Sequence, residues 1–141
     1  MKTLALDIGD VWIGSAISDG AGITCRPYQT VKLEELENFL RKVLIEEMIG
    51  TVVVGHPITV GGTVSEQTKK IESTFVHLKE MFDAVDWVLR DERYSSKRAA
   101  ALTRTKPSAK GRSQKKKERE HSVAAAFVLQ SYLDYKAYMG G

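Results

Sequence analysis

The sequence predicts an α/β fold: a mixed five-stranded sheet, with its first three strands antiparallel and the next two parallel, flanked by helices. Three observations support this prediction. The chain opens with two short apolar segments and a third expected strand, and their connections are too short for a crossover helix, which is typical of an antiparallel meander. Two later segments, 51–54 and 85–89, are short and almost wholly apolar, as in strands buried on both faces of a parallel sheet. Segments with helical periodicity lie between and after them.

Turn-forming residues and apolar spacing set the expected boundaries. The expected strands are 4–6, 13–17, 23–31, 51–54 and 85–89, and the expected helices are 33–48, 64–82, 95–102 and 119–138. The helix over 33–48 follows from apolar residues that recur on one face. Ser95 or Ser96 can cap the short helix. The last helix carries an apolar set made up of Val123, Ala124, Phe127, Val128 and Tyr132. The first strand is expected at the centre of the sheet.

Composition favours a single soluble domain covering residues 1–141. The chain is long enough to bury a core. It has no apolar run near the roughly 20 residues that a bilayer crossing needs, so no membrane partner is expected. Its single cysteine, Cys25, excludes a disulfide framework and a cysteine-based metal site. A cytoplasmic location is the expectation that follows.

Positive charge is concentrated in one segment. Between Arg104 and Arg119 there are eight Lys or Arg residues against one acid, whereas the rest of the chain has thirteen basic and seventeen acidic residues. This asymmetry indicates a polyanionic partner, with the stretch at about 104–117 acting as a mobile basic loop. A solvated loop without a partner is the alternative. The candidate contacts to a nucleic-acid backbone are Arg104, Lys106, Lys110, Arg112, Lys115, Lys116 and Lys117, together with Arg93 and Thr63.

Acidic residues stand at the ends of two strands expected to be parallel. Asp7 closes the first strand, and Asp91-Glu92 follows the strand at 85–89. In open sheets of this kind, sites form outside the carboxyl ends of the parallel strands. Neighbouring carboxylates repel unless a cation lies between them, and all-oxygen ligands suit Mg²⁺ or Mn²⁺. Because direction alternates along a strand, at most one of Asp91 and Glu92 faces a site shared with Asp7, and Arg93 is a salt-bridge partner for the other.

Two further segments each allow two interpretations. Gly61-Gly62-Thr63 is either a plain connection in which Thr63 caps the next helix, or a turn whose amide groups bind a phosphate. Trp12 follows the first turn, and its ring either stacks on a base or is buried over the sheet edge.

Four motifs together resemble the YqgF (RuvX-like) family of the RNase H-like superfamily. They are DIGDVWIGSAISD, VVVGHPITVGGT, DERYSS and AAAFVLQSYLD, in the family's order and spacing over nearly the whole chain. The family is associated with pre-16S rRNA maturation and is also described as Holliday-junction-resolvase-like. The resemblance implies an RNase H-like fold and divalent-metal-dependent cleavage of a phosphodiester, with Asp7 and Glu92 as acidic ligands.

The chain departs from the family pattern at two places. The third acid of the family begins its last helix, where this chain has His121, and a Lys-Arg pair of the family is replaced by Val11-Trp12. His121 can bind Mn²⁺ through nitrogen, or carry a proton to or from the reacting water, and loss of activity is the third alternative. The expected catalytic and metal-binding set is therefore Asp7, Glu92 and His121.

The function expected from these arguments is a Mg²⁺- or Mn²⁺-dependent nuclease that matures the 5′ end of precursor 16S rRNA. The alternatives are a Holliday-junction-resolvase-like nuclease acting on branched DNA and a non-catalytic nucleic-acid-binding protein. DIGDVWIG also resembles the phosphate loop of actin-like and sugar-kinase-like nucleotide binders, but those proteins close two domains around a nucleotide, and this chain has residues for one. The sequence leaves the oligomeric state open.

Overall fold

The computed structural model describes residues 1–56, 66–91 and 114–140, with the backbone alone for 114–118. In chain order the elements are β1 (Lys2–Ile8), β2 (Trp12–Ser18), β3 (Cys25–Lys32), the 3₁₀ turn η1 (Leu33–Glu35), α1 (Leu36–Glu46), β4 (Ile49–His56), α2 (Glu66–Met81), β5 (Asp86–Asp91) and α4 (Gln114–Tyr138). No helix among these elements is long and apolar enough to cross a membrane.

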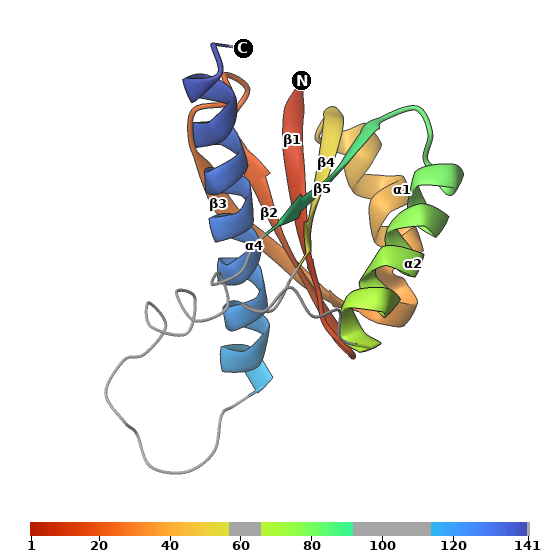
Figure 1. Cartoon of the computed structure of the whole chain (residues 1–141). Coiled ribbons are helices and arrows are strands. Elements are labelled where there is room, and N and C mark those ends of the chain that lie inside the picture. The colour runs from red at the N-terminus through yellow and green to blue at the C-terminus, as the bar shows by residue number, and fades with distance from the viewer. Residues whose placement is uncertain (57–65, 92–113, 141) are drawn as a thin grey trace.

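The five strands form one mixed sheet in the order β3-β2-β1-β4-β5 (Figure 1). β1 pairs antiparallel with β2 and parallel with β4, and β4 pairs parallel with β5. The predicted sheet is therefore confirmed, with the first strand at its centre. The carboxyl ends of β1, β4 and β5 lie at the same edge of the sheet, where the sequence predicts a site.

Helices cover both faces of the sheet. Figure 1 shows α1 and α2 on one side of the strands and α4 crossing the other. Side chains alternate between these faces along β1: Leu4 and Leu6 belong to the core beneath α1 and α2, whereas Ala5 belongs to the core beneath α4. The same alternation places Asp7 on the α4 face.

The helix expected over 33–48 is present, but it begins later. Residues 33–35 form η1, and α1 then buries Leu36, Leu40 and Val43 on the predicted face. Met48 follows the helix with a φ of 53°, in the left-handed region that commonly ends helices. The expected helix over 64–82 corresponds to α2, whose Ile71 and Leu78 are buried.

The parallel strands are longer than predicted. β4 spans Ile49–His56 rather than 51–54, because the ladder to β1 begins at Lys2 and Ile49. β5 spans Asp86–Asp91 rather than 85–89, so Asp91 is the last residue of the strand and pairs with His56. The predicted short helix at 95–102 lies outside the described residues.

The last helix differs most from the prediction. α4 begins at Gln114 rather than at residue 119, so residues 115–117 of the basic segment belong to a helix and not to a loop. Gln, Lys, Glu and Arg are good helix formers, and they extend the helix even though this stretch has no apolar face. The buried face is also shifted, because Ala125 and Leu129 are fully buried while Val123 and Phe127 are only partly buried.

Candidate active site

Asp7 and His121, which are 114 residues apart in the sequence, meet at the carboxyl end of β1. His121 Nδ1 lies 3.1 Å from Asp7 Oδ2, which is hydrogen-bond distance. The side chain of Asp7 is 26% exposed and that of His121 is 31% exposed, so solvent can reach both. The structure thus brings together two of the three residues that the sequence analysis selected as catalytic and metal-binding.

Asp7 owes its position to the central strand. It is the penultimate residue of β1, on the face that α4 covers, and its partner across the antiparallel ladder is Gly14 of β2. A carboxylate in the middle of a strand would be buried in the core, whereas one at the end of the strand lies at the rim. Because Asp7 is near the end of β1, its backbone belongs to the sheet while its carboxylate remains accessible to solvent.

His121 is placed by a close approach between α4 and β2. A Cβ atom built on Gly14 would overlap the carbonyl group of His121 and the backbone nitrogen of Ser122. The helix backbone therefore lies directly on the strand at Gly14, which is possible only because Gly14 has no side chain. Ser122 is buried at this contact, and its hydroxyl donates to the carbonyl of Arg119.

A second glycine, Gly9, leaves room for the imidazole of His121 because it has no side chain. A Cβ on Gly9 would lie 2.7 Å from the carbonyl oxygen of Trp12 and 3.0 Å from Cε1 of His121. The β1–β2 turn and the imidazole therefore flank the same small space beside Asp7. Gly9 and Gly14 are residues that the sequence analysis did not assign to the site. A glycine inside a strand is the signal that could have indicated the close approach.

The donor pair fits part of the coordination sphere of a divalent cation. Two adjacent ligands of an octahedral Mg²⁺ at about 2.1 Å lie about 3.0 Å apart, close to the 3.1 Å between Asp7 Oδ2 and His121 Nδ1. Imidazole nitrogen suits Mn²⁺ better than Mg²⁺. In the described part of the chain, no group of three or more His, Cys, Asp or Glu residues could hold a metal ion. Within the described residues this edge of the sheet therefore offers two neighbouring donor atoms, Asp7 Oδ2 and His121 Nδ1.

The last residues of β4 and β5, His56 and Asp91, face the opposite side of the sheet. His56 ends β4, and its Nε2 lies 2.8 Å from Oε1 of Glu72 in α2. Asp91 pairs with His56 in the ladder, and paired residues of parallel strands point to the same face. Asp91 is therefore on the α2 face and is not the acid that shares a site with Asp7.

Arg90, one residue earlier in β5, lies on the α4 face. Its Nη2 and Nε donate to the hydroxyl of Ser131 at 3.1 and 3.2 Å, and its guanidinium lies 4.9 Å from the ring centre of Tyr135. These contacts fasten the edge strand β5 to α4. They also fix which residues of β5 point toward the helix.

The remaining predicted site residues lie outside what the structure describes. This applies to the third catalytic candidate, Glu92, and to Thr63, Arg93, Arg104, Lys106, Lys110 and Arg112. Lys115, Lys116 and Lys117 have a described backbone in α4, one to two turns before His121.

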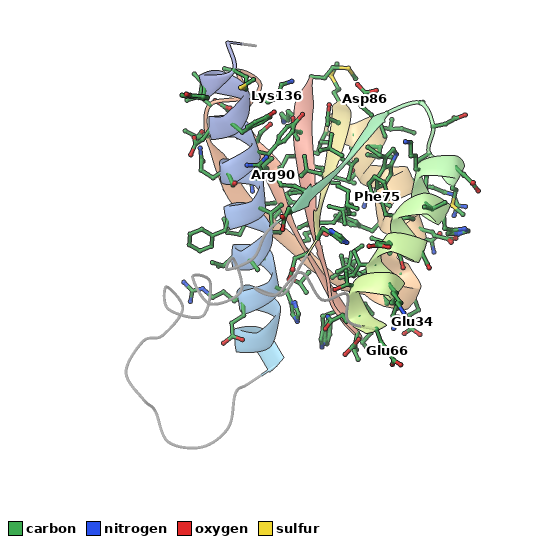
Figure 2. All side chains as sticks on the ribbon, viewed as in Figure 1. Glu34, Glu66, Phe75, Asp86, Arg90 and Lys136 are labelled. Carbon is green, nitrogen blue, oxygen red and sulfur yellow. The ribbon has the colours of Figure 1, made fainter. Side chains whose placement is uncertain are left out.

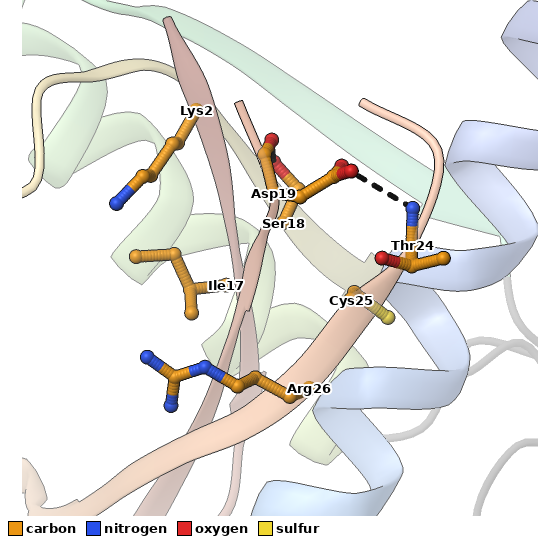
Figure 3. Close-up of a pocket in the computed structure, with 7 residues that line it drawn as sticks. All are labelled: Lys2, Ile17, Ser18, Asp19, Thr24, Cys25 and Arg26. Atoms are coloured by element: carbon orange, nitrogen blue, oxygen red, sulfur yellow. Dashed lines mark hydrogen bonds between the residues drawn. The ribbon is translucent and has the colours of Figure 1, made fainter. Parts of the chain in front are cut away.

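A separate pocket lies at the opposite end of the sheet (Figure 3). Its volume is about 210 Å³, and it is lined by Lys2, Ile17, Ser18, Asp19, Thr24, Cys25 and Arg26. The carboxylate of Asp19 accepts hydrogen bonds from the backbone N–H groups of Ile23 and Thr24, and the bond from Ile23 lowers its pKa from the ordinary value. Lys2 is paired with Glu47 at 2.9 Å. Asp19 and Lys2 are thus bound to partners within the fold, and this pocket does not present a carboxylate and an imidazole side by side as the edge at Asp7 does.

The thiol of Cys25 at this pocket is held in its neutral form. Burial, assisted by the negative charge of Asp134, raises its pKa to about 11. The thiol lies 3.3 Å from the carbonyl oxygen of Ala126 and 3.6 Å from Oε1 of Gln130, both in α4. Cys25 therefore helps to attach β3 to α4, and its environment is that of a structural cysteine and not of a nucleophile.

A model of one protein family matches almost the entire chain. The family is described as "RuvX: Holliday junction resolvase", and the match covers residues 1–135. The chain belongs to the RuvX family. A relative from Rubrobacter xylanophilus, named "Putative pre-16S rRNA nuclease", is 36% identical over 133 residues, which cover 94% of this chain and 92% of the relative. A relative of the same name from Shouchella clausii is 35% identical, with 98% of each chain covered.

Solved structures confirm the predicted RNase H-like fold of this RuvX-family chain. RuvC of T. thermophilus in complex with a Holliday junction substrate superposes with a TM-score of 0.59 and 16% identity, covering 99% of this chain and 97% of the RuvC chain. Fowlpox virus resolvase in complex with Holliday junction DNA gives a TM-score of 0.55 and 18% identity, covering 96% and 98%. At these identities the likeness concerns the fold alone.

Proposed function

We propose that this RuvX-family protein is a divalent-metal-dependent nuclease that hydrolyses phosphodiester bonds in structured RNA, with the 5′ end of precursor 16S rRNA as its substrate. The observation that carries the proposal is the pairing of Asp7 with His121 at the carboxyl end of the central strand. The names of the relatives support the choice of substrate. This substrate also places the reaction in the cytoplasm.

Asp7, His121 and Glu92 are the residues that would hold Mg²⁺ or Mn²⁺. Support for Asp7 and His121 comes from the spacing of their donor atoms. Support for Glu92 comes from the family resemblance, which implies that it is an acidic ligand, and from Asp91, the other acid of the pair, which faces α2. A carboxylate there would add the negative charge that the His121 substitution removes.

The bound ion would supply Lewis acidity, which activates a water molecule and stabilises charge on the leaving oxygen. The protein's own contribution is to hold the side chains of Asp7 and His121 in position. Asp7 is fixed by the sheet, and it also orients the imidazole through the contact to Nδ1. If Nδ1 carries the hydrogen in that contact, Nε2 has the lone pair and can take or return a proton; if Nδ1 is unprotonated, it is the ligand.

The basic segment supplies the candidate contacts to the substrate backbone. Lys115, Lys116 and Lys117 belong to the first turns of α4, four to six residues before His121 in the chain. Arg104, Lys106, Lys110, Arg112, Arg93 and Thr63 complete the proposed set. Such contacts bind phosphates without reading bases, so affinity should fall steeply with salt.

The test is a cleavage assay with three substrates: a precursor 16S rRNA fragment that includes the mature 5′ end, an unrelated structured RNA, and a four-way DNA junction. Each is incubated with Mg²⁺, with Mn²⁺ and with EDTA. We expect cleavage of the precursor at the mature 5′ end with either metal and none with EDTA. Salt-dependent binding without cleavage would instead identify a non-catalytic nucleic-acid-binding protein.

Branched DNA is the second candidate substrate, because the description of the family model names a Holliday junction resolvase. The same assay separates the two candidates. Metal-dependent cleavage of the junction, with both RNA substrates left intact, would replace the RNA proposal with that activity.

A further inference from the structure

An aromatic ring and a lysine lie together at the rim of the candidate active site. Trp12 is the first residue of β2 and pairs with Lys32, the last residue of β3. The ammonium of Lys32 lies 5.7 Å from the centre of the Trp12 ring, in cation–π contact. Trp12 is partly exposed and Lys32 is exposed, so the pair is part of the surface.

Strand alternation places this pair on the face that carries Asp7 and His121. Ile13 belongs to the core beneath α1 and α2, whereas Gly14 contacts α4. Trp12 is two residues before Gly14, so its ring is on the α4 face, and Lys32 shares that face as its ladder partner. A Cβ on Gly9 would lie 2.7 Å from the backbone carbonyl oxygen of Trp12 and 3.0 Å from Cε1 of His121, so the backbone of Trp12 lies near the imidazole.

The core does not require a tryptophan at this position. The other tryptophan of the chain, Trp87, is 9% exposed, packs edge-on against Phe75 at 6.1 Å, and donates its indole N–H to the carbonyl of Phe82. Trp12 belongs to neither buried cluster. Its neighbour Val11 is also 57% exposed, so the turn presents apolar surface next to a charged site.

We infer that Trp12 and Lys32 form a subsite for one unpaired nucleotide next to the scissile phosphate, with the base stacked on the indole and the phosphate paired with the lysine. This inference rests on the proposed function, and it narrows the substrate to RNA that is single-stranded at the cleavage point. A base that stacks on the ring takes the place of the ammonium, which then moves to the nucleotide's phosphate. Bases inside a duplex hide their faces in the stack, so a duplex cannot use this subsite.

Intrinsic fluorescence tests the inference without any cleavage, because the chain has two tryptophans in different environments. The protein is titrated in EDTA with a single-stranded RNA, with the same RNA in a duplex, and with the matching single-stranded DNA. We expect the single strands to quench the wild-type emission and the duplex to leave it unchanged. Trp12→Phe is the matched control, since its remaining tryptophan is buried Trp87 and its emission should not respond.

Binding affinity, measured by fluorescence anisotropy with labelled RNA, supplies the second readout. Trp12→Leu should weaken single-strand binding about 5- to 150-fold, the range for loss of one stacked base. Trp12→Phe keeps a ring and should retain most of the affinity. Lys32→Met should reduce the slope of log affinity against log salt by about 0.7, as expected for loss of one phosphate contact on a single strand.

The outcomes separate this inference from the proposed function. RNA binding with unchanged Trp12 emission, and equal affinity for wild type and Trp12→Leu, would overturn the subsite and leave the nuclease proposal standing. Equal quenching by duplex and single strand would also overturn it, since stacking would then not be the cause. Single-strand-specific quenching combined with failure of the cleavage assay would support stacking of an unpaired base on Trp12, but it would contradict the nuclease and with it the position beside a scissile phosphate.

Discussion

Gly14 lies directly opposite Asp7 in the β1–β2 ladder, and its missing side chain brings helix α4 down to the carboxylate. Figure 2 shows that side chains fill the space between sheet and helices on both sides. At Gly14 the helix backbone takes the place of such a side chain. The distance between Asp7 and His121 therefore depends on a residue that contributes no functional group.

Gly14→Ala should both destabilise the protein and impair its proposed activity. The added methyl group overlaps the α4 backbone, which cannot move aside as a flexible side chain could. We expect a loss of about 2 kcal/mol or more in the free energy of unfolding, measured by urea denaturation. Gly20→Ala is the control: a Cβ there meets nothing within 4 Å, and stability should change by less than about 1 kcal/mol. Equal effects of the two variants would contradict the close-approach argument.

Asp7→Asn should abolish metal-dependent cleavage with little effect on folding. The amide keeps the size of the carboxylate and can still hydrogen-bond to His121, but it lacks the negative charge that holds a cation. We expect the free energy of unfolding to stay within about 1 kcal/mol of the wild type. Asp10→Asn, three residues away in the exposed β1–β2 turn, is the matched control and should cleave normally. Unchanged cleavage by Asp7→Asn would remove Asp7 from the mechanism.

His121→Asp distinguishes the two proposed roles of the imidazole. If His121 is a metal ligand, an aspartate there restores the acid expected from the family pattern, and activity with Mg²⁺ should be retained or raised relative to Mn²⁺. If His121 carries a proton instead, activity should fall about 100-fold or more with both metals. His121→Ala serves as the reference that lacks both functions. Full activity of His121→Ala would exclude either role.

His121→Asp should also change the stability of the protein in a metal-dependent way. Without metal, the new carboxylate faces Asp7 at close range, and the repulsion should lower the free energy of unfolding by about 1–2 kcal/mol. Added Mg²⁺ should reverse this loss, because an ion that binds the folded state stabilises it. A melting temperature of His121→Asp that does not respond to Mg²⁺ would indicate that no cation binds between the two residues.

Cys25 should react slowly with alkylating reagents until the solution is strongly alkaline. A pKa of about 11 leaves about one thiol in a thousand ionised at pH 8. The rate of iodoacetamide labelling of the folded protein should therefore rise through pH 11, whereas the urea-unfolded protein should react readily near pH 9. Similar rates in the two states at pH 8 would contradict the burial of this thiol between β3 and α4.

The raised pKa of Cys25 also has a consequence for stability. Between the unfolded value near 9 and the folded value near 11, the folded state holds the proton more tightly than the unfolded state does. Stability contributed by the neutral thiol is thus fully present below about pH 9 and is lost as the pH rises through 11. Cys25→Ser should flatten this alkaline decline in urea denaturation curves collected from pH 8 to pH 11.

Sequence patterns sufficed for the sheet because its strands carry strong local signals. The short connections of the meander and the apolar run around Val52 left few topologies open, and the central place of β1 followed. The predicted ends of elements were less accurate where the polarity of a segment suggests a loop but the helix propensity of its residues favours a helix. The run of lysines before His121 looks like a loop by its charge, but its residues favour helix, and α4 begins at Gln114.

The sequence singled out Asp7 and His121 but not their geometry, and their catalytic and metal-binding roles remain predictions. Asp7 stands out by its place at the end of a strand, whereas the position of His121 was indicated only by the family resemblance. That the imidazole touches Asp7 depends on how α4 crosses β2, and this contact between distant segments is set by Gly14 and Gly9, which the sequence analysis read as part of turns or strands. Glu92 remains a prediction, because it lies outside the described residues.

The central place of β1 has a mechanical consequence for the two halves of the Asp7–His121 pair. β1 pairs with β4 as far as Leu6 and with β2 as far as Ile8, so Asp7 cannot shift without opening the β1–β2 ladder. His121 is held by the packing of a single helix against that sheet. If substrate binding requires Asp7 and His121 to separate, we expect the movement to come from α4 while Asp7 stays in place.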